Sequence, residues 1–224
     1  MSDRKIVIVG TGQFAEIALE YCDAFTDYEV VGFAVERAYL DRLQWHDRPV
    51  VAFEELETHF DTATHDILVA VVFTQLNRLR SRLVAEASAK GFRLARFVSD
   101  QAFIAPSARV GAHCFIFERN VIQSQVEIGD NVVLWSGNHI GHHARIEDNV
   151  FVSSHVVVSG SCHIGRNSFL GVNAAIGDGV RIGEDCWVGP GAVVLNDLPD
   201  RQIIRAAKSE LARVDTHRFF RLKA

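Results

Sequence analysis

The feature that most restricts how this chain can fold is a six-residue period in its second half. Every sixth residue there is Ile, Leu or Val, sixteen times in succession. Since these residue types make up only about a quarter of the chain, such a run has a chance probability on the order of 10^-9. The positions are Ile104, Val110, Ile116, Ile122, Ile128, Leu134, Ile140, Ile146, Val152, Val158, Ile164, Leu170, Ile176, Ile182, Val188 and Val194.

A hexapeptide of this kind forms one side of a triangular coil. The aliphatic residue points inward, a small or β-branched residue four places later accompanies it, and Gly, Asn or Asp supplies the turn. Three hexapeptides make one coil, so the period predicts about five coils stacked at roughly 4.8 Å. We therefore expect residues 99–200 to form a parallel β-helix, a prism with three sheets.

Residues 1–98 have the alternating pattern of an α/β unit, which predicts a Rossmann-like domain. Buried strands are expected at Ile6–Val9, Glu29–Phe33 and Asp66–Phe73, with one helix after the first strand and another over Gln75–Gly91.

Residues 201–224 form a tail after the prism. The segment Ser209–Leu222 is predicted to be a helix with Leu211, Val214 and Phe219 on one side. We expect this helix to cap the prism or to pack on a neighbouring subunit.

The overall composition bears on compartment and partners. The net charge is -5 and Lys and Arg are scattered, so no basic face is available to bind a nucleic acid. The N-terminal apolar run is too short for a signal sequence or a membrane span, so we expect a cytoplasmic protein. The four cysteines lie far apart without a CxxC pair, which favours buried reduced thiols.

The first predicted strand runs directly into the turn Gly10-Thr11-Gly12-Gln13-Phe14-Ala15, which opens a helix. The N-terminus of such a helix can hold a diphosphate. The domain is too short for a full dinucleotide fold, so a sugar nucleotide is favoured over NAD. The residues predicted to bind it are Gly10, Gly12, Gln13, Phe14, Glu36 and Thr74.

This order of a glycine-rich turn, a short α/β unit and a hexapeptide prism resembles the sugar acyltransferases of the PglD/NeuD/PerB/VioB type. These are nucleotide-amino-sugar N-acetyltransferases and sialic acid O-acetyltransferases. The resemblance covers nearly the whole chain. It implies a left-handed β-helix, a homotrimer that uses acetyl-CoA, a sugar nucleotide held by the N-terminal domain, and an active site between adjacent prisms.

The resemblance also implies a catalytic base. The segment His139–Ile146 aligns without gaps on the family segment that contains the catalytic His, and His142 falls on that residue. His143 stands where the family carries an acidic residue thought to orient the base, and Trp135 stands where an Asn near the sugar is usual. An imidazole, which titrates near neutral pH, suits the removal of a proton from the acceptor.

Acyl transfer also needs a donor for the oxyanion. Positions in the prism repeat with each coil, which places Gly160 one coil beyond His142 and makes its N–H the predicted donor, as the resemblance also implies. His143 is either an orienting partner of the base or a solvated neighbour. His139 and His155 are expected to line an interface or the substrate cleft, whereas His113 and His163 are predicted to be structural.

Coenzyme A in such enzymes lies along a groove between prisms, against backbone amides of the later coils. Small residues there allow the pantetheine to approach. The predicted contacts are Gly171, Asn173, Ala174, Gly189, Pro190 and Gly191.

Sequence and resemblance together predict an acetyl-CoA-dependent N-acetyltransferase that acts on a nucleotide-linked amino sugar without a metal. O-acetylation of a sialic acid or another sugar is the alternative within the same class. A metalloenzyme of the γ-carbonic anhydrase kind shares the prism, but no trio of histidines here has the spacing of its zinc ligands. A non-catalytic trimeric binding module is the remaining alternative.

Overall fold

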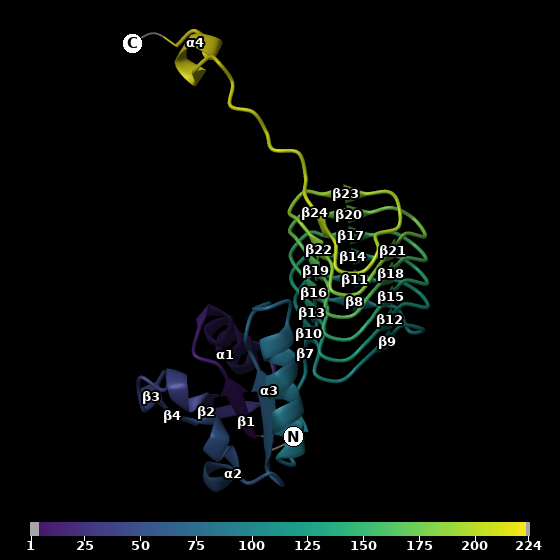
Figure 1. The fold of residues 1–224 in the computed structure, drawn as a ribbon. Coiled ribbons are helices and arrows are strands. Elements are labelled where there is room, and N and C mark those ends of the chain that lie inside the picture. The colour runs from purple at the N-terminus through teal and green to yellow at the C-terminus, as the bar shows by residue number, and fades with distance from the viewer. Residues whose placement is uncertain (1–4, 223–224) are drawn as a thin grey trace.

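The computed structural model describes residues 5–222 and contains a β-helix of short parallel strands (Figure 1). The strands form three sheets, which we call face 1, face 2 and face 3. Strands one coil apart pair in parallel; Phe115, for example, lies opposite both Phe97 and Val133. The coil length predicted from the sequence is therefore confirmed by the strand register.

Each coil contributes one strand of two residues to each face. Face 1 contains β7 (Phe97–Val98), β10 (Phe115–Ile116), β13 (Val133–Leu134), β16 (Phe151–Val152), β19 (Phe169–Leu170), β22 (Trp187–Val188) and β24 (Ile203–Ile204). Face 2 contains β8 (Phe103–Ile104), β11 (Val121–Ile122), β14 (His139–Ile140), β17 (Val157–Val158), β20 (Ala175–Ile176) and β23 (Val193–Val194). Face 3 contains β9 (Arg109–Val110), β12 (Glu127–Ile128), β15 (Arg145–Ile146), β18 (His163–Ile164) and β21 (Arg181–Ile182).

The predicted inward positions form the core of the prism. Ile104 and Val110, in the first coil, are partly buried, and the other fourteen aliphatic residues of the period are buried. Residues four places later, such as Ala144 and Val156, belong to the same buried cluster. Burial of apolar surface stabilises a fold by roughly 25 cal/mol per Å². These parallel sheets and repeats fit a left-handed β-helix.

The corners of the prism are short turns whose third residue adopts a left-handed backbone conformation. Asn131 and Asn149 have φ angles of 58° and 61° at the corner between faces 3 and 1. His143 (φ 59°) holds this position between faces 2 and 3, and His155 (φ 58°) holds it between faces 1 and 2. Asn, Asp and His tolerate this conformation better than most residues, which accounts for their periodic placement.

The N-terminal part is a six-stranded, mostly parallel sheet in the order β3-β4-β2-β1-β5-β6. Helix α1 packs on the side of the sheet that faces the prism, whereas α2 and α3 cover the opposite side. The elements are β1 (Lys5–Val9), α1 (Gln13–Phe25), β2 (Glu29–Val35), β3 (Gln44–Trp45), β4 (Arg48–Ala52), α2 (Leu56–His59), β5 (His65–Val69), α3 (Arg78–Ala89) and β6 (Arg93–Leu94).

Two predicted elements of this part have different ends in the structure. The strand expected over Asp66–Phe73 ends at Val69, and the helix expected over 75–91 begins at Arg78. Between them, Phe73 leaves the sheet and packs on Phe169 of face 1, with 4.5 Å between the ring centroids. Residues 75–77 then all have positive φ angles, so the chain turns before the helix starts.

Aromatic residues join the N-terminal part to face 1. Phe14, at the start of α1, lies 5.2 Å from Phe115 and 5.6 Å from Trp135 between ring centroids. Phe73 packs in the same way on Phe169 and Trp187. The outward residue is aromatic in five of the seven strands of face 1, and these residues recur at multiples of the coil length. Face 1 is therefore the face that the N-terminal part covers.

A buried polar cluster fixes the N-terminal part against the prism. Arg80 is 1% exposed, and its Nε donates to Asn131 Oδ1 at 2.7 Å. Its terminal nitrogens donate to the carbonyl oxygens of Val69 at 2.5 Å and His113 at 3.3 Å. Burial lowers the pKa of Arg80 to about 10. Burial and the charge of Arg80 lower the pKa of His113 to about 3.

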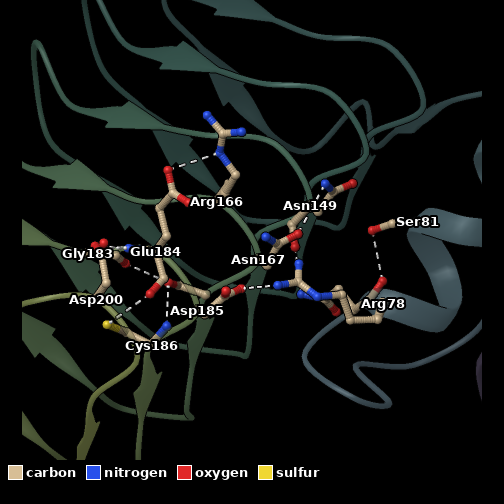
Figure 2. Close-up of polar contacts among 12 residues, drawn as sticks. Arg78, Ser81, Asn149, Arg166, Asn167, Gly183, Glu184, Asp185, Cys186 and Asp200 are labelled. Carbon is tan, nitrogen blue, oxygen red and sulfur yellow. Dashed lines mark hydrogen bonds and ion pairs between the residues drawn. The ribbon is translucent and has the colours of Figure 1, made fainter.

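A ladder of side chains continues along the corner between faces 3 and 1 (Figure 2). Asn131 Nδ2 donates to Asn149 Oδ1 at 2.8 Å, and Asn149 Nδ2 donates to Asn167 Oδ1 at 3.3 Å. In the next coil, Arg78 from the start of α3 pairs with Asp185 at 2.6 Å (Figure 2). Because the ladder runs along the stack of coils, it sets the position of α3 along the prism.

The prediction of a long C-terminal helix is wrong. Helix α4 covers only Thr216–Phe220, and the rest of Ser209–Leu222 is not helical. Every described residue from 207 onward is exposed, and Figure 1 shows the tail leading away from the prism, so it does not cap its own prism. Helices this short are marginal without tertiary packing. Within residues 5–222, no helix is long and apolar enough to cross a membrane.

Candidate functional site

Two predicted catalytic residues meet at the corner between faces 2 and 3. His142 lies in the turn after β14, and Gly160 lies in the turn after β17, one coil further along. A Cβ placed on Gly160 would stand 2.6 Å from His142 Cε1 and 2.8 Å from His142 Nε2. The imidazole therefore rests on the glycine and occupies the space of a side chain there.

Two polar groups at this contact, His142 Nε2 and the Gly160 N–H, are free to bind a ligand. The carbonyl oxygens of His142 and Gly160 accept bonds from Ser161 N and Gly179 N, at 2.8 and 2.9 Å. Within the described part of the chain, neither the Gly160 N–H nor His142 Nε2 has a hydrogen-bond partner. A proton acceptor and a backbone donor thus lie side by side.

His143 lies beside the candidate base. His142 Nδ1 is 3.2 Å from His143 Nδ1, and the two rings are nearly perpendicular. The backbone N–H of His142 donates to Gln123 Oε1 at 2.9 Å, which fixes the start of the turn. When the shared proton resides on His142 Nδ1, His142 Nε2 carries a free lone pair and can accept a proton.

Other predicted prism residues lie at the corner between faces 1 and 2 or on face 2. The ring of His155 rests on Gly137, where a Cβ would stand 2.6 Å from His155 Nδ1. Trp135 stacks on Phe117 at 4.5 Å between ring centroids and belongs to the aromatic contact with α1. His139 projects half-buried from β14 on the outer side of face 2.

The six residues predicted to contact coenzyme A also lie at the corner between faces 1 and 2, in two successive coils. A Cβ on Gly171 would stand 2.6 Å from Pro190 N, so the stacking of these coils already requires a glycine. This corner and the corner with His142 are opposite edges of face 2. One protomer therefore does not bring the predicted coenzyme residues to the predicted base. The six are Gly171, Asn173, Ala174, Gly189, Pro190 and Gly191.

A cavity of about 390 Å³ opens at the carboxyl ends of β1, β2 and β5. Gly10, with a φ of 126°, turns the chain there, and a Cβ on it would stand 2.8 Å from Ala70 O, so only glycine fits. Gly12 and the first residues of α1 line the cavity, so the helix N-terminus faces it, and no side chain caps that end of the helix. Six of the eight residues predicted to bind the substrate line it, Gly10, Gly12, Gln13, Phe14, Glu36 and Thr74, whereas Trp135 and His155 lie on the prism.

The apolar wall and the mouth of this cavity escaped the sequence analysis. Tyr39, in a 3-10 turn over Arg37–Tyr39, lines the mouth and is 71% exposed. An aromatic residue shortly after the acidic end of the second strand was the available signal. Glu36 pairs with Arg82 of α3 at 2.9 Å. The other lining residues missed are Val9, Thr11, Val35, Ala70, Val71, Val72, Leu79 and Leu83.

His113, His163 and the four cysteines have structural surroundings. His113 is buried, and its Nε2 accepts a bond from Val69 N at 3.3 Å. His163 pairs with Glu147 at 2.8 Å. The four cysteines are buried and unbridged. In the part that the structure describes, no group of three or more His, Cys, Asp or Glu is placed to hold a metal ion.

Comparison with known proteins shows which proteins share this fold. Residues 126–160 and 161–196 match the bacterial transferase hexapeptide family (six repeats). No curated protein sequence matches the chain.

Among solved structures, the acetyltransferase domain of PglB from Neisseria gonorrhoeae has a TM-score of 0.80 at 27% identity, covering 89% of this chain and 95% of that one. A mutant of perosamine N-acetyltransferase from Caulobacter crescentus, in complex with CoA and GDP-perosamine, has a TM-score of 0.78 at 28% identity, covering 89% and 92%. WeeI from Acinetobacter baumannii shares the fold at 18% identity, with a TM-score of 0.76 over 89% and 95% of the chains. The resemblance drawn from the sequence is thereby confirmed, and the chain is an acyltransferase with hexapeptide repeats whose sheets fit a left-handed β-helix.

Proposed function

We propose that this chain is an acetyl-CoA-dependent N-acetyltransferase that acts on a nucleotide-linked amino sugar. The observation that carries the proposal is the contact of the His142 imidazole with Gly160, which leaves a proton acceptor and a backbone donor unpaired and adjacent. His142 Nε2 removes a proton from the acceptor nitrogen, and the Gly160 N–H stabilises the oxyanion. His143 holds the tautomer of His142 that leaves Nε2 free.

The solved relatives support acetyl-CoA as the co-substrate and a nucleotide-linked amino sugar as the acceptor. The PglB domain has been solved in complex with acetyl coenzyme A, at 26% identity to this chain. The perosamine N-acetyltransferase has been solved with CoA and GDP-perosamine, at 28% identity. The proposed chemistry needs no metal, because an imidazole and a backbone N–H supply the base and the oxyanion donor.

The N-terminal cavity supports a nucleotide sugar as the acceptor. We propose that residues 1–98 form a Rossmann-like domain, ahead of a catalytic prism over 99–200 and a tail over 201–224. The diphosphate binds at the N-terminus of α1, next to Gly10 and Gly12. Tyr39 stacks on the nucleobase of the nucleotide sugar, and Glu36 accepts a hydrogen bond from the ribose or from the edge of the nucleobase.

Face 2 supports a homotrimer. Its outward residues are apolar except for His139, and three of them are well exposed: Phe103 is 59%, Val157 43% and Val193 61% exposed. Exposed apolar patches of this kind mark interfaces. His142 and the residues predicted to contact coenzyme A lie at opposite edges of face 2, so a second prism packed beside the first completes the site. A cytoplasmic location belongs to the same proposal, since acetyl-CoA and nucleotide sugars are substrates of that compartment.

Thiol release from acetyl-CoA tests the proposal with a panel of UDP-, GDP- and dTDP-linked 3- and 4-amino sugars. We expect thiol release with at least one member, and a rate roughly 10^2-fold lower or more for His142→Asn. His59→Gln, which alters an exposed histidine in α2, is the control and should keep full activity. The proposal is wrong if no amino sugar gives thiol release, or if His142→Asn turns over normally.

A further inference from the structure

In several turns of the prism, an aspartate carboxylate accepts a hydrogen bond from a backbone N–H in the turn of the preceding coil. Asp130 Oδ1 accepts a bond from Ala112 N at 2.6 Å, and Asp148 Oδ1 accepts one from Asp130 N at 2.8 Å. Asp200 Oδ1 accepts from Glu184 N at 2.9 Å in the last coils. A carboxylate at this position therefore normally pairs with a backbone N–H below it.

Asp178 departs from this pattern. It follows Gly160 at the same spacing at which Asp130 follows Ala112. Among residues 5–222, however, the Asp178 carboxylate and the Gly160 N–H have no hydrogen-bond or ion-pair partner. The turn that carries the candidate oxyanion donor, Gly160, thus lacks the hydrogen bond that comparable turns make.

The open carboxylate lies next to the candidate base. Asp178 Oδ1 stands 3.0 Å from the position of a Cβ on Gly160, and His142 Nε2 stands 2.8 Å from the same point. The sum of these distances, about 5.8 Å, is the upper limit of the separation of the two atoms. An anionic oxygen, an imidazole nitrogen and a backbone N–H therefore converge, and the two side chains are exposed to solvent.

We propose that Asp178 adapts this site to an amine acceptor in preference to a hydroxyl; this inference rests on the proposed function. An amine attacks the thioester through the lone pair of its nitrogen, which forms the C–N bond while the carbonyl electron pair moves to oxygen. The intermediate has a negative oxygen and a positive nitrogen. His142 Nε2 takes a proton from that nitrogen, the C=O bond re-forms, the C–S bond breaks, and the departing thiolate takes the proton from the imidazolium.

The charges of the site complement this intermediate. The Gly160 N–H faces the negative oxygen, and the Asp178 carboxylate stabilises the positive nitrogen. The same carboxylate attracts the ammonium form in which an amino sugar arrives, before that ammonium loses a proton to solvent. A hydroxyl acceptor brings no positive charge and forms an anionic intermediate, which a nearby carboxylate disfavours.

Asp178→Asn tests the inference because it keeps the shape of the side chain and removes its charge. The two substrates are an amino-sugar nucleotide that the wild-type protein accepts and its analogue with a hydroxyl in place of the amine. We expect kcat/KM to fall at least about ten-fold for the amine, and to stay the same or rise for the hydroxyl. The loss for the amine should shrink at pH values above the pKa of that amine, where the acceptor arrives neutral.

Asp130→Asn is the matched control, since it makes the same change in a turn at another corner and should alter neither substrate. Equal losses of Asp178→Asn on both acceptors, or no loss on the amine at any pH, would overturn the role of Asp178 while leaving the proposed function intact. A wild-type protein that releases no thiol with any amino sugar, or that prefers the hydroxyl analogue, overturns the inference together with the N-acetyltransferase proposal.

Discussion

The imidazole of His142 lies directly against the α-carbon of Gly160, so no side chain fits between these two coils. The φ angle of Gly160 is not positive, and an alanine at this position therefore meets no backbone strain. The methyl group of the alanine would instead meet the imidazole of His142, an exposed side chain that can turn aside. The contact can thus be broken without unfolding the prism.

We expect Gly160→Ala to lower kcat/KM roughly 10^2-fold, because the added methyl displaces the proposed base and crowds the proposed oxyanion donor. The midpoint of thermal unfolding should move by only a few degrees, about what 1 kcal/mol produces in a domain of this size. Steady-state kinetics and a thermal melt measure the two effects. In a His142→Ala background the same change should cost little more, and a full additional loss would contradict the contact.

Val157→Asp should dissociate the proposed trimer. The change puts a carboxylate into the outer column of face 2, which is apolar apart from His139, and an interface would have to bury its charge. Light scattering after size exclusion should then give a mass near 24.9 kDa, that of one chain. Arg145→Asp, at the equivalent position of face 3, is the control and should stay trimeric. An unchanged mass for Val157→Asp would place the interface elsewhere.

Arg80→Met should lower the free energy of unfolding by about 3 kcal/mol, because buried carbonyl oxygens and Asn131 lose charge-assisted hydrogen bonds. Urea denaturation measures this loss. Arg82→Met, on the exposed side of the same helix, should cost less than about 1 kcal/mol. Similar losses for the two variants would mean that the buried cluster does not hold the N-terminal part on the prism.

His113 should make the protein less stable in mild acid. Burial and the Arg80 charge lower its pKa in the folded state from 6.5 to about 3, so the folded form stays neutral while the unfolded chain takes up a proton. The stability from this group is complete above about pH 6.5, falls by roughly 1.4 kcal/mol per pH unit below it, and is lost at about pH 3, where the folded form is protonated too. Urea denaturation at several pH values should show a shallower acid slope for His113→Gln than for His59→Gln. Identical slopes would rule out this source of acid sensitivity.

The architecture of the prism and the juxtaposition of His142 and Gly160 follow from local spacing. A six-residue period places Ile140 and Ile146 inward, because each hexapeptide is one side of a coil and needs only its neighbours to define the repeat. The same periodicity predicts that Gly160 lies one coil from His142, and the structure puts them in contact. The cavity around Gly10 also follows locally, from a strand that runs into a glycine turn and a helix.

Contacts between distant segments determine the rest, and no local pattern specifies them. From the sequence, Arg80 is expected to be a solvated arginine of an amphipathic helix. In the structure, docking on the prism buries it against Asn131. The tail reads as a helix because of its apolar spacing, yet without a surface to pack on it is helical only over Thr216–Phe220. Repetition along the chain is enough to specify the β-helix, whereas the docking of the α/β part and the state of the tail depend on burial that only the assembled molecule provides.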